Sequence, residues 1–393
     1  MMNSILILLN ICNIIIIKII NFFYKLENYN SKIGNCFKNI LINSGPIAIK
    51  IGQCISSRDD ILSLEMCNIL SELTTDVQYY DDSDMYNNIY FSNKLAKLYL
   101  NIADCRRIGS GTIAIVYKTK INNSDVVLKI RRPNIEYEIE RSFRIIYFCF
   151  MFYSVQSIDF CEKLNKLKNV ILKQIDFGNE FNELNYFYDI YKNSSDIIIP
   201  KTYAKYCSDD IITMEYIEGI AINKLSTDMK RRIGKLLWRF SFESCFIHGK
   251  YHSDLHKGNL LLTSNNKLCI LDYGLTGKIS GFDKSILFNY NTHIFKKQWR
   301  MAAKLYVNKM VVNNDMSSEC KYKFINEVEE ILKLCLSKTV PNLVESVYKL
   351  EQCSKKNNTK FNNKYCDFEL AFSTLISTLY GLNCFNIFDF EDL

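Results

Sequence analysis

Three residues in the second half of the chain have the types and the order that phosphoryl transfer requires. Asp254 and Asn259 lie in the segment HSDLHKGN, and Asp272 begins a later Asp-Tyr-Gly triplet. In this chemistry one carboxylate orients the attacking hydroxyl or water, while an amide oxygen and a second carboxylate hold the metal ions that bridge the phosphates. We therefore expect Asp254 to be catalytic, and Asn259 and Asp272 to bind Mg²⁺. A hairpin expected over residues 260–271 would bring the two metal ligands together.

Three of the four histidines, His248, His252 and His256, fall in the same window at intervals of four residues. On a helix this spacing would align them for zinc. The glycines on either side and the neighbouring carboxylate favour a loop instead. In that loop we expect His252 to fix the backbone and to bind no metal.

A glycine-rich turn precedes these segments. The sequence GSGTIA at residues 109–114 leads into a β-branched strand, and its glycines let backbone amides approach phosphate groups. A second strand-like segment, residues 126–130, follows at hairpin distance and carries one lysine, Lys129, among apolar residues. The candidate nucleotide-binding residues of this part of the chain are Gly109, Ser110, Gly111, Ala114, Lys129, Glu215 and Tyr216.

Burying Lys129 among valine and isoleucine is unfavourable unless its charge is paired. We expect this lysine to meet both a nucleotide phosphate and a carboxylate, and to take part in catalysis together with Glu180. Asp176 and Glu183 are the alternative partners. A surface lysine on an edge strand is the remaining interpretation.

The rest of the pattern predicts a small sheet between helical regions. Residues 24–100 read mostly helical, and the chain beyond Gly219 is again mainly helical. Between them we expect strands at residues 113–120, 126–130, 197–203 and 211–216, and helices at residues 135–156 and 162–192. This order predicts an α+β chain with the bilobal plan of a protein kinase.

The composition is that of a folded protein in a reducing compartment. Hydrophobic residues make up 48% and charged residues 23% of the 393 residues, which excludes a disordered chain. The net charge of +7 is spread over single residues without a dense cluster or a reading motif, so we expect no nucleic-acid binding. Fifteen cysteines without a CxxC pair indicate scattered thiols rather than disulfides.

The N-terminal region contains an apolar run from Ile5 to Phe23 whose single charge is Lys18. Crossing a bilayer takes about 20 apolar residues. No positive residue precedes the run and no small-residue cleavage site follows it, which argues against a signal peptide. We expect a membrane-associated helix; the alternative is a helix buried against the body of the protein.

Together these segments resemble the UbiB (aarF-domain) family of atypical kinases. The sequence GPIAIKIGQ at residues 45–53 is similar to the family's KxGQ signature, and residues 57–62 continue the match. VVLKIRRP, QIDFGNE, HSDLHKGN and DYG then follow in the family's order, so the resemblance runs from about residue 31 to residue 280. Aminoglycoside and choline phosphotransferases have a similar catalytic loop but lack the KxGQ helix.

The resemblance implies an ATP-binding atypical kinase or ATPase that supports isoprenoid-quinone or lipid metabolism, commonly at membranes of mitochondria, plastids or bacteria. It also implies that the KxGQ helices cover the active site and exclude peptides, with Lys50 and Gln53 pointing into the nucleotide site. The expected partners are ATP, Mg²⁺, a small-molecule or lipid acceptor and a membrane surface. The expected regions are an apolar helix at 1–23, a helical KxGQ extension at 24–101, an N-lobe at 102–217 and a helical C-lobe at 218–393.

The sequence departs from the family at three places. Gln174 stands where the family's ExD motif has glutamate, and only Asp176 of that motif is retained. Leu255 and Lys257 replace prolines of the catalytic loop, and the usual alanine-rich nucleotide loop is glycine-rich here. Gln174 favours a nucleotide-gated scaffold, the intact Asp-Asn-Asp set favours an active ATPase or small-molecule kinase, and the KxGQ segment argues against a protein kinase.

Overall fold

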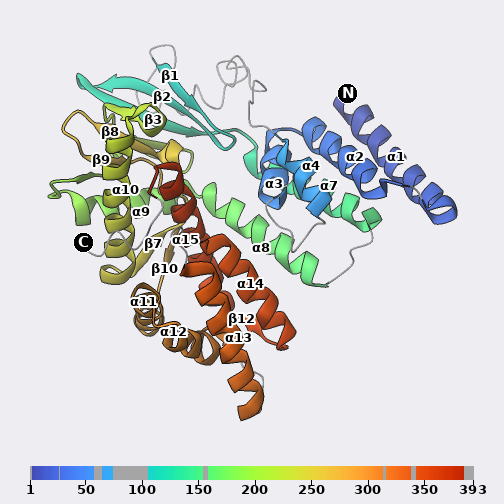
Figure 1. The fold of residues 1–393 in the computed structure, drawn as a ribbon. Coiled ribbons are helices and arrows are strands. Elements are labelled where there is room, and N and C mark those ends of the chain that lie inside the picture. The colour runs from blue at the N-terminus through green and yellow to red at the C-terminus, as the bar shows by residue number, and fades with distance from the viewer. Residues whose placement is uncertain are drawn as a thin grey trace. The chain divides into compact units, whose positions relative to one another are not determined.

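The computed structural model describes residues 2–25, 27–56, 64–73, 105–153, 158–312, 316–337 and 342–384 (Figure 1). These residues form two compact units. The first unit takes the chain up to Asn179 together with Thr202–Tyr216, and the second takes Glu180–Lys201 together with the chain from Ile217 onward. Helices and antiparallel sheets occur in both, which confirms the predicted α+β class.

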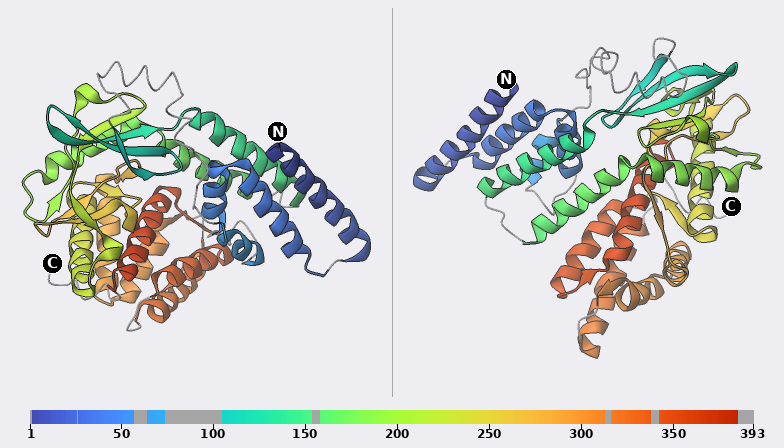
Figure 2. Two further views of the ribbon diagram at one scale, coloured as in Figure 1. Left: turned by 90° about the horizontal axis from the view of Figure 1, so that it is seen from above. Right: turned by 180° about the vertical axis from the view of Figure 1, so that it is seen from behind.

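The first unit begins with helices α1 (Met2–Tyr24), α2 (Tyr29–Ser44), α3 (Pro46–Ser56) and α4 (Leu64–Ser71). Helices α1 and α2 lie side by side, as the two bluest helices of Figure 2 show. Helix α2 buries Ile33, Phe37, Ile40 and Leu41, whose spacing places them on one face. Within the described part of the chain, no helix combines the length and apolar character that crossing a bilayer requires.

A four-stranded antiparallel sheet follows in the first unit, with the order β1-β2-β3-β5. Its strands are β1 (Arg106–Ser110), β2 (Ala114–Ile121), β3 (Ser124–Arg131) and β5 (Ile211–Glu215). Asn122 and Asn123 connect β2 to β3 with positive φ angles of 50° and 66°, which asparagine tolerates and tight hairpin turns require. The two strands predicted around this turn are confirmed.

Helices α7 (Ile135–Tyr153), α8 (Ile158–Gln174) and α9 (Phe177–Tyr191) come between β3 and β5 in the chain. The continuous helix predicted over residues 162–192 is wrong, because the chain breaks at Ile175 and Asp176. The Asp176 carboxylate accepts a 2.8 Å hydrogen bond from the Asn179 N–H and so caps the start of α9. The boundary between the two units falls inside α9.

The second unit combines short strands with a helical region. Its strands are β4 (Ile197–Ile198), β6 (Gly219–Ala221), β7 (Lys250–His252), β8 (Leu260–Thr263), β9 (Leu268–Ile270), β10 (Thr276–Lys278), β11 (Val311–Val312) and β12 (Lys360–Phe361). Its helices after α9 are α10 (Thr227–Phe242), α11 (Gly281–Phe295), α12 (Trp299–Leu305), α13 (Ser318–Leu336), α14 (Leu343–Lys356) and α15 (Asn363–Gly381). The predicted hairpin is present as β8 and β9, whereas the strand expected over residues 197–203 shortens to β4.

Candidate active site

The catalytic-loop segment lies between two paired strands of the second unit. Strands β7 and β10 are antiparallel, with His252 opposite Thr276, and the Ser253 N–H donates to the Leu275 carbonyl at 2.9 Å. This pairing sets the residues that follow β7 beside those that precede β10. Asp254 and Asp272 are therefore brought to the same end of one small sheet.

His252 ties the two segments together. Its buried ring accepts a 3.1 Å hydrogen bond from the Asp254 N–H at Nδ1, so the proton sits on Nε2, which donates to the Asp272 carbonyl at 2.5 Å. Burial lowers the pKa of His252, against the opposing effect of the bond to that carbonyl. The neutral ring thus fixes the loop, as the sequence predicted.

The hairpin of β8 and β9 brings the backbones of the two predicted metal ligands near each other. The Leu271 N–H donates to the Asn259 carbonyl at 3.0 Å, which places Asn259 next to Asp272. The Asn259 Nδ2 donates to the Asp254 carbonyl at 3.1 Å, so the amide nitrogen is engaged and Oδ1 is the atom that could bind a metal. One amide oxygen and one carboxylate suit Mg²⁺, a hard cation that takes its other ligands from water and phosphate.

A zinc site needs three or more His, Cys, Asp or Glu side chains close together. Among the described residues, no such group is present. The three histidines instead lie in separate settings, since His248 follows a π-helical turn over Glu243–Ile247 and His252 ends β7. The zinc interpretation therefore has no support in this part of the chain.

His256 is a neighbour of Asp254 that sequence reasoning missed. Its Nδ1 accepts a 3.0 Å hydrogen bond from the Gly258 N–H, and its Nε2 lies 3.7 Å from Oδ2 of Asp254. A Cβ at residue 258 would approach the His256 ring to 2.8 Å, so a larger residue there would displace the ring from this position. Lys257 also lies close to a glycine: a Cβ on Gly381, the last residue of α15, would meet its Nζ at 2.1 Å.

A buried ion pair holds β7, the strand that leads into the catalytic loop, against α9. Lys250 donates to both oxygens of Glu183 at 2.7 and 2.8 Å, and its Nζ lies 3.7 Å from the centroid of the Tyr186 ring. Both charged side chains are buried. This pair joins α9 to β7, and it gives Glu183 a partner other than Lys129.

In the first unit, Lys129 sits on the central strand β3, opposite Val116 of β2 and Ile212 of β5. A partner strand on each side excludes the edge-strand interpretation. Its Nζ lies 5.5 Å from the centroid of the Phe177 ring. Glu180 is buried in the second unit, whereas Lys129 lies in the first. The pairing of Lys129 with Glu180 stays a prediction.

The glycine-rich turn joins β1 to β2. The Gly111 N–H donates to the Ala114 carbonyl at 2.8 Å, so this amide is committed to the hairpin rather than to a phosphate. A Cβ at either Gly109 or Gly111 would meet its nearest neighbour at 3.5 Å, an ordinary contact. Glu215 is the last residue of β5. The centroid of the Tyr216 ring, which follows it, lies 3.6 Å from Nζ of Lys118.

The KxGQ residues lie on α3 and contact other parts of the first unit. Lys50 Nζ donates to Oε1 of Gln174 at 3.0 Å, and Gln53 Nε2 donates to the Leu73 carbonyl at 2.8 Å. Residues 57–62, which continue the motif in the sequence, lie outside the described residues. Whether Lys50 and Gln53 also reach a nucleotide stays a prediction.

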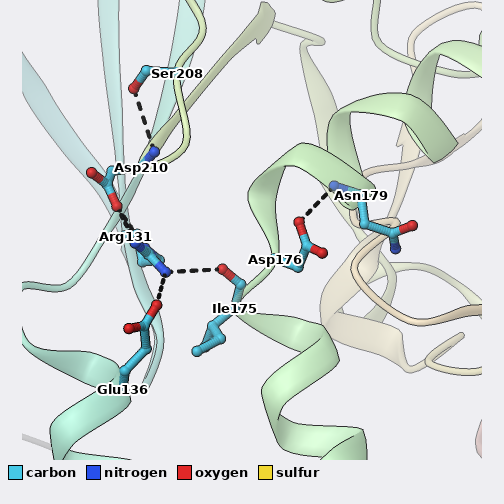
Figure 3. Close-up of polar contacts among 7 residues, drawn as sticks. All are labelled: Arg131, Glu136, Ile175, Asp176, Asn179, Ser208 and Asp210. Carbon is cyan, nitrogen blue, oxygen red and sulfur yellow. Dashed lines mark hydrogen bonds and ion pairs between the residues drawn. The ribbon is translucent and has the colours of Figure 1, made fainter.

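Arg131, at the end of β3, connects three segments of the first unit (Figure 3). Its Nε donates to Asp210 Oδ1 at 2.7 Å, and its Nη1 donates to Glu136 Oε1 at 3.0 Å and to the Ile175 carbonyl at 3.3 Å. The strand that carries Lys129 is thereby bonded to the junction from which α9 begins.

A scan against protein-family models matches residues 85–306 to the ABC1 atypical kinase-like domain. The chain belongs to this family. It is 29% identical over 85% of its length to a Clostridium pasteurianum protein named "Uncharacterized protein in hydrogenase 1 5'region". It is 25% identical over 73% of its length to "Probable protein kinase UbiB" of Histophilus somni, and 28% identical over 62% to "Protein ACTIVITY OF BC1 COMPLEX KINASE 8, chloroplastic" of Arabidopsis thaliana. The chain covers 64%, 56% and 34% of these relatives' own lengths.

The fold is also similar to a solved structure, the erythromycin complex of Rv3197 from Mycobacterium tuberculosis. The TM-score is 0.50 at 14% identity, over 85% of this chain and 87% of that one. ABC1 membership confirms the predicted resemblance and the kinase-like fold class. The matched range contains Lys129, Asp254, Asn259 and Asp272.

For this ABC1 chain, the contacts that sequence reasoning missed are Lys250 with Glu183, Arg131 with the start of α9, and His256 with Asp254. Arg131 follows the apolar residues of β3, which is a weak signal of a buried partner, whereas Lys250 stands among polar and small residues and gives no such signal. Nothing in the sequence shows which carboxylate or carbonyl that partner is.

Proposed function

We propose that this chain is an ATP- and Mg²⁺-dependent atypical kinase or ATPase of the UbiB kind that acts in, or supports, lipid or isoprenoid-quinone metabolism. The observation that carries the proposal is the arrangement around His252. This one neutral ring holds the Asp254 amide and the Asp272 carbonyl, and the loop it fixes also positions Asn259. ABC1 family membership supports the same activity.

Each of the predicted site residues has one task in the proposed reaction. Asp254 orients the attacking hydroxyl or water and takes up its proton as the new O–P bond forms, while the bond from the γ-phosphorus to the bridging oxygen breaks and ADP leaves. Asn259 Oδ1 and the Asp272 carboxylate would hold Mg²⁺, and the bound ion would neutralise charge on the phosphates. Lys129 binds a phosphate of the nucleotide and pairs with Glu180.

The acceptor we propose is a small molecule or lipid rather than a peptide. This rests on the KxGQ helix α3, where Lys50 and Gln53 lie one turn apart and share a face. Robust phosphorylation of generic protein substrates by the unmodified chain would contradict this part of the proposal.

We also propose that the protein associates with a membrane in a reducing compartment. One face of α1 packs on the protein through Ile7 and Ile14, while Leu8 and Leu9 on the other side are 61% and 54% exposed. Helix α1 has no acidic residue, and its one charge is Lys18. An exposed apolar helix face of this kind binds at a bilayer surface. The cysteines of the described residues are free thiols, which suits a reducing compartment.

A nucleotide-gated scaffold is the second candidate function. It is favoured by Gln174, because the amide that Lys50 contacts replaces a family carboxylate and removes a negative charge. A phosphotransferase of the aminoglycoside or choline kinase type is the third candidate, and the KxGQ helix argues against it.

Steady-state ATP hydrolysis by the purified chain distinguishes the enzyme from the nucleotide-gated scaffold. It would be measured with and without liposomes and with candidate phenolic lipids, using Asp272→Asn as the inactive control. Mg²⁺-dependent hydrolysis above that control supports the enzyme. Saturable ATP binding with hydrolysis equal to the control supports the scaffold.

A further inference from the structure

Arg132 lies directly under the glycine-rich turn. It follows β3 and is only 4% exposed. Its Nε donates to the Gly111 carbonyl at 2.9 Å, and its Nη2 donates to Ser110 Oγ at 2.9 Å. Its own N–H donates to the Ile113 carbonyl at 2.8 Å. One buried side chain and its backbone thus hold three residues of the turn.

These bonds determine how the peptide between Gly111 and Thr112 is oriented. The described residues contain no cis peptide, and in a planar trans peptide the C=O and the following N–H point in opposite directions. Since the Gly111 carbonyl faces the Arg132 guanidinium, the Thr112 N–H points away from it. The Gly111 N–H is already bonded to the Ala114 carbonyl. Of these two amides, it is therefore the Thr112 N–H that points out of the turn.

A glycine-rich turn needs such a lock. Glycine populates positive and negative φ with similar ease, so a peptide next to it can flip at low energy. The flipped peptide would present a carbonyl oxygen, which repels an anion, where the N–H would attract one. A guanidinium presents several donors in a rigid plane and can hold a carbonyl and a hydroxyl at once, which an ammonium on a flexible stem does less well.

We propose that Arg132 is the positioning residue of the nucleotide loop: it locks the Gly111–Thr112 peptide so that the Thr112 N–H is presented to a phosphate of ATP. This inference rests on the proposed ATP binding and names the residue that prepares the loop for it. The neighbouring Arg131 serves a different segment, because it bonds Asp210, Glu136 and the Ile175 carbonyl (Figure 3).

The test compares Arg132→Gln, Arg132→Lys and Ser110→Ala by calorimetric titration of ATP and of adenosine in the presence of Mg²⁺. Arg106→Gln is the matched control, since Arg106 is exposed on β1 of the same hairpin. We expect Arg132→Gln to weaken ATP binding by about tenfold, the loss of one charge-assisted hydrogen bond. Adenosine, which has no phosphate, should bind within about twofold of wild type. Arg132→Lys should recover only part of the ATP affinity, because it keeps the charge without the fork.

Ser110→Ala removes one partner of the guanidinium at an exposed position, so it keeps the test decisive if Arg132→Gln fails to fold. It should weaken ATP binding by less than Arg132→Gln and leave adenosine binding unchanged. Equal losses for ATP and adenosine, or ATP affinity unchanged in both the Ser110 and Arg132 variants, would overturn the inference alone. Absence of ATP binding by the wild-type chain would overturn the proposed function as well.

Discussion

Lys50 on α3 donates a 3.0 Å hydrogen bond to Oε1 of Gln174, the last residue of α8, across 124 positions of the sequence. The contact places the lysine of the KxGQ motif against the one residue of the ExD motif that has lost its carboxylate. A neutral acceptor gives this bond less strength than a charged acceptor would.

Gln174→Glu should therefore stabilise the protein, by about 1 kcal/mol, since it turns a neutral acceptor into the partner of an ion pair. The free energy of unfolding in denaturant would be compared for wild type and variant. The control is the same change in a Lys50→Met background, where the gain should vanish. An equal gain in both backgrounds would show that Lys50 is not the partner.

Asp272→Asn should abolish Mg²⁺-dependent ATP binding, because it removes the carboxylate that balances the metal charge. Asn259→Ala should weaken the dependence on Mg²⁺ without removing it. ATP titrations over a range of Mg²⁺ concentrations would measure both effects. Unchanged binding by a folded Asp272→Asn protein would rule out the metal assignment.

Asp254→Asn should leave ATP binding close to wild type and lower turnover strongly, since orienting the acceptor matters only for the chemical step. Binding and hydrolysis would be measured on the same preparation. A loss of affinity equal to that of Asp272→Asn would place Asp254 among the metal ligands instead.

Lys129 and Glu180 should be energetically coupled. Glu180 is buried and Lys129 is partly buried, so removing one partner should cost about 3 kcal/mol, the low end for a buried pair, whereas removing both costs less than the sum. A double-mutant cycle with Lys129→Met and Glu180→Gln would measure the coupling through the free energy of unfolding. Additive losses would reject the pairing. Asp176 and Glu183 are poor alternative partners for Lys129, because Asp176 caps α9 and Glu183 pairs with Lys250.

Leu8→Ser combined with Leu9→Ser should release the protein from anionic liposomes in a flotation assay while leaving the unfolding midpoint unchanged, because both side chains are exposed. Ile14→Ser is the matched control, as Ile14 is buried on the opposite face and its loss should lower stability. If the unmodified chain stays in the liposome-free fraction, membrane docking by α1 is contradicted.

Gly109→Ala combined with Gly111→Ala should weaken ATP binding and alter the preference between ADP and ATP, because the added Cβ atoms restrict the loop that wraps the phosphates. The structure makes this test clean, since both Cβ atoms meet only ordinary contacts and the protein should fold. Calorimetric titration of ATP and ADP would decide. A change confined to thermal stability would reduce the glycines to a plain turn.

Features that depend on near neighbours in the chain could be predicted from residue types alone. The hairpin turn at Asn122 and Asn123 and the hairpin of β8 and β9 follow from residue types that favour tight turns. The order of Lys129, Asp254, Asn259 and Asp272 predicted phosphoryl-transfer chemistry, and the KxGQ segment together with these motifs predicted the family. The break before α9 was not predicted, although aspartate at position 176 is a favoured helix cap and gave a local signal for it.

Contacts between residues far apart in the sequence are visible only in the folded structure. Lys250 with Glu183, Lys50 with Gln174, and Arg132 with the turn at Gly111 all join segments that local spacing cannot relate. A charged residue in an apolar segment shows that a partner is needed, yet many carboxylates and carbonyls in the chain would serve. Which one is used depends on how whole strands and helices pack, and that is a property of the folded chain as a whole.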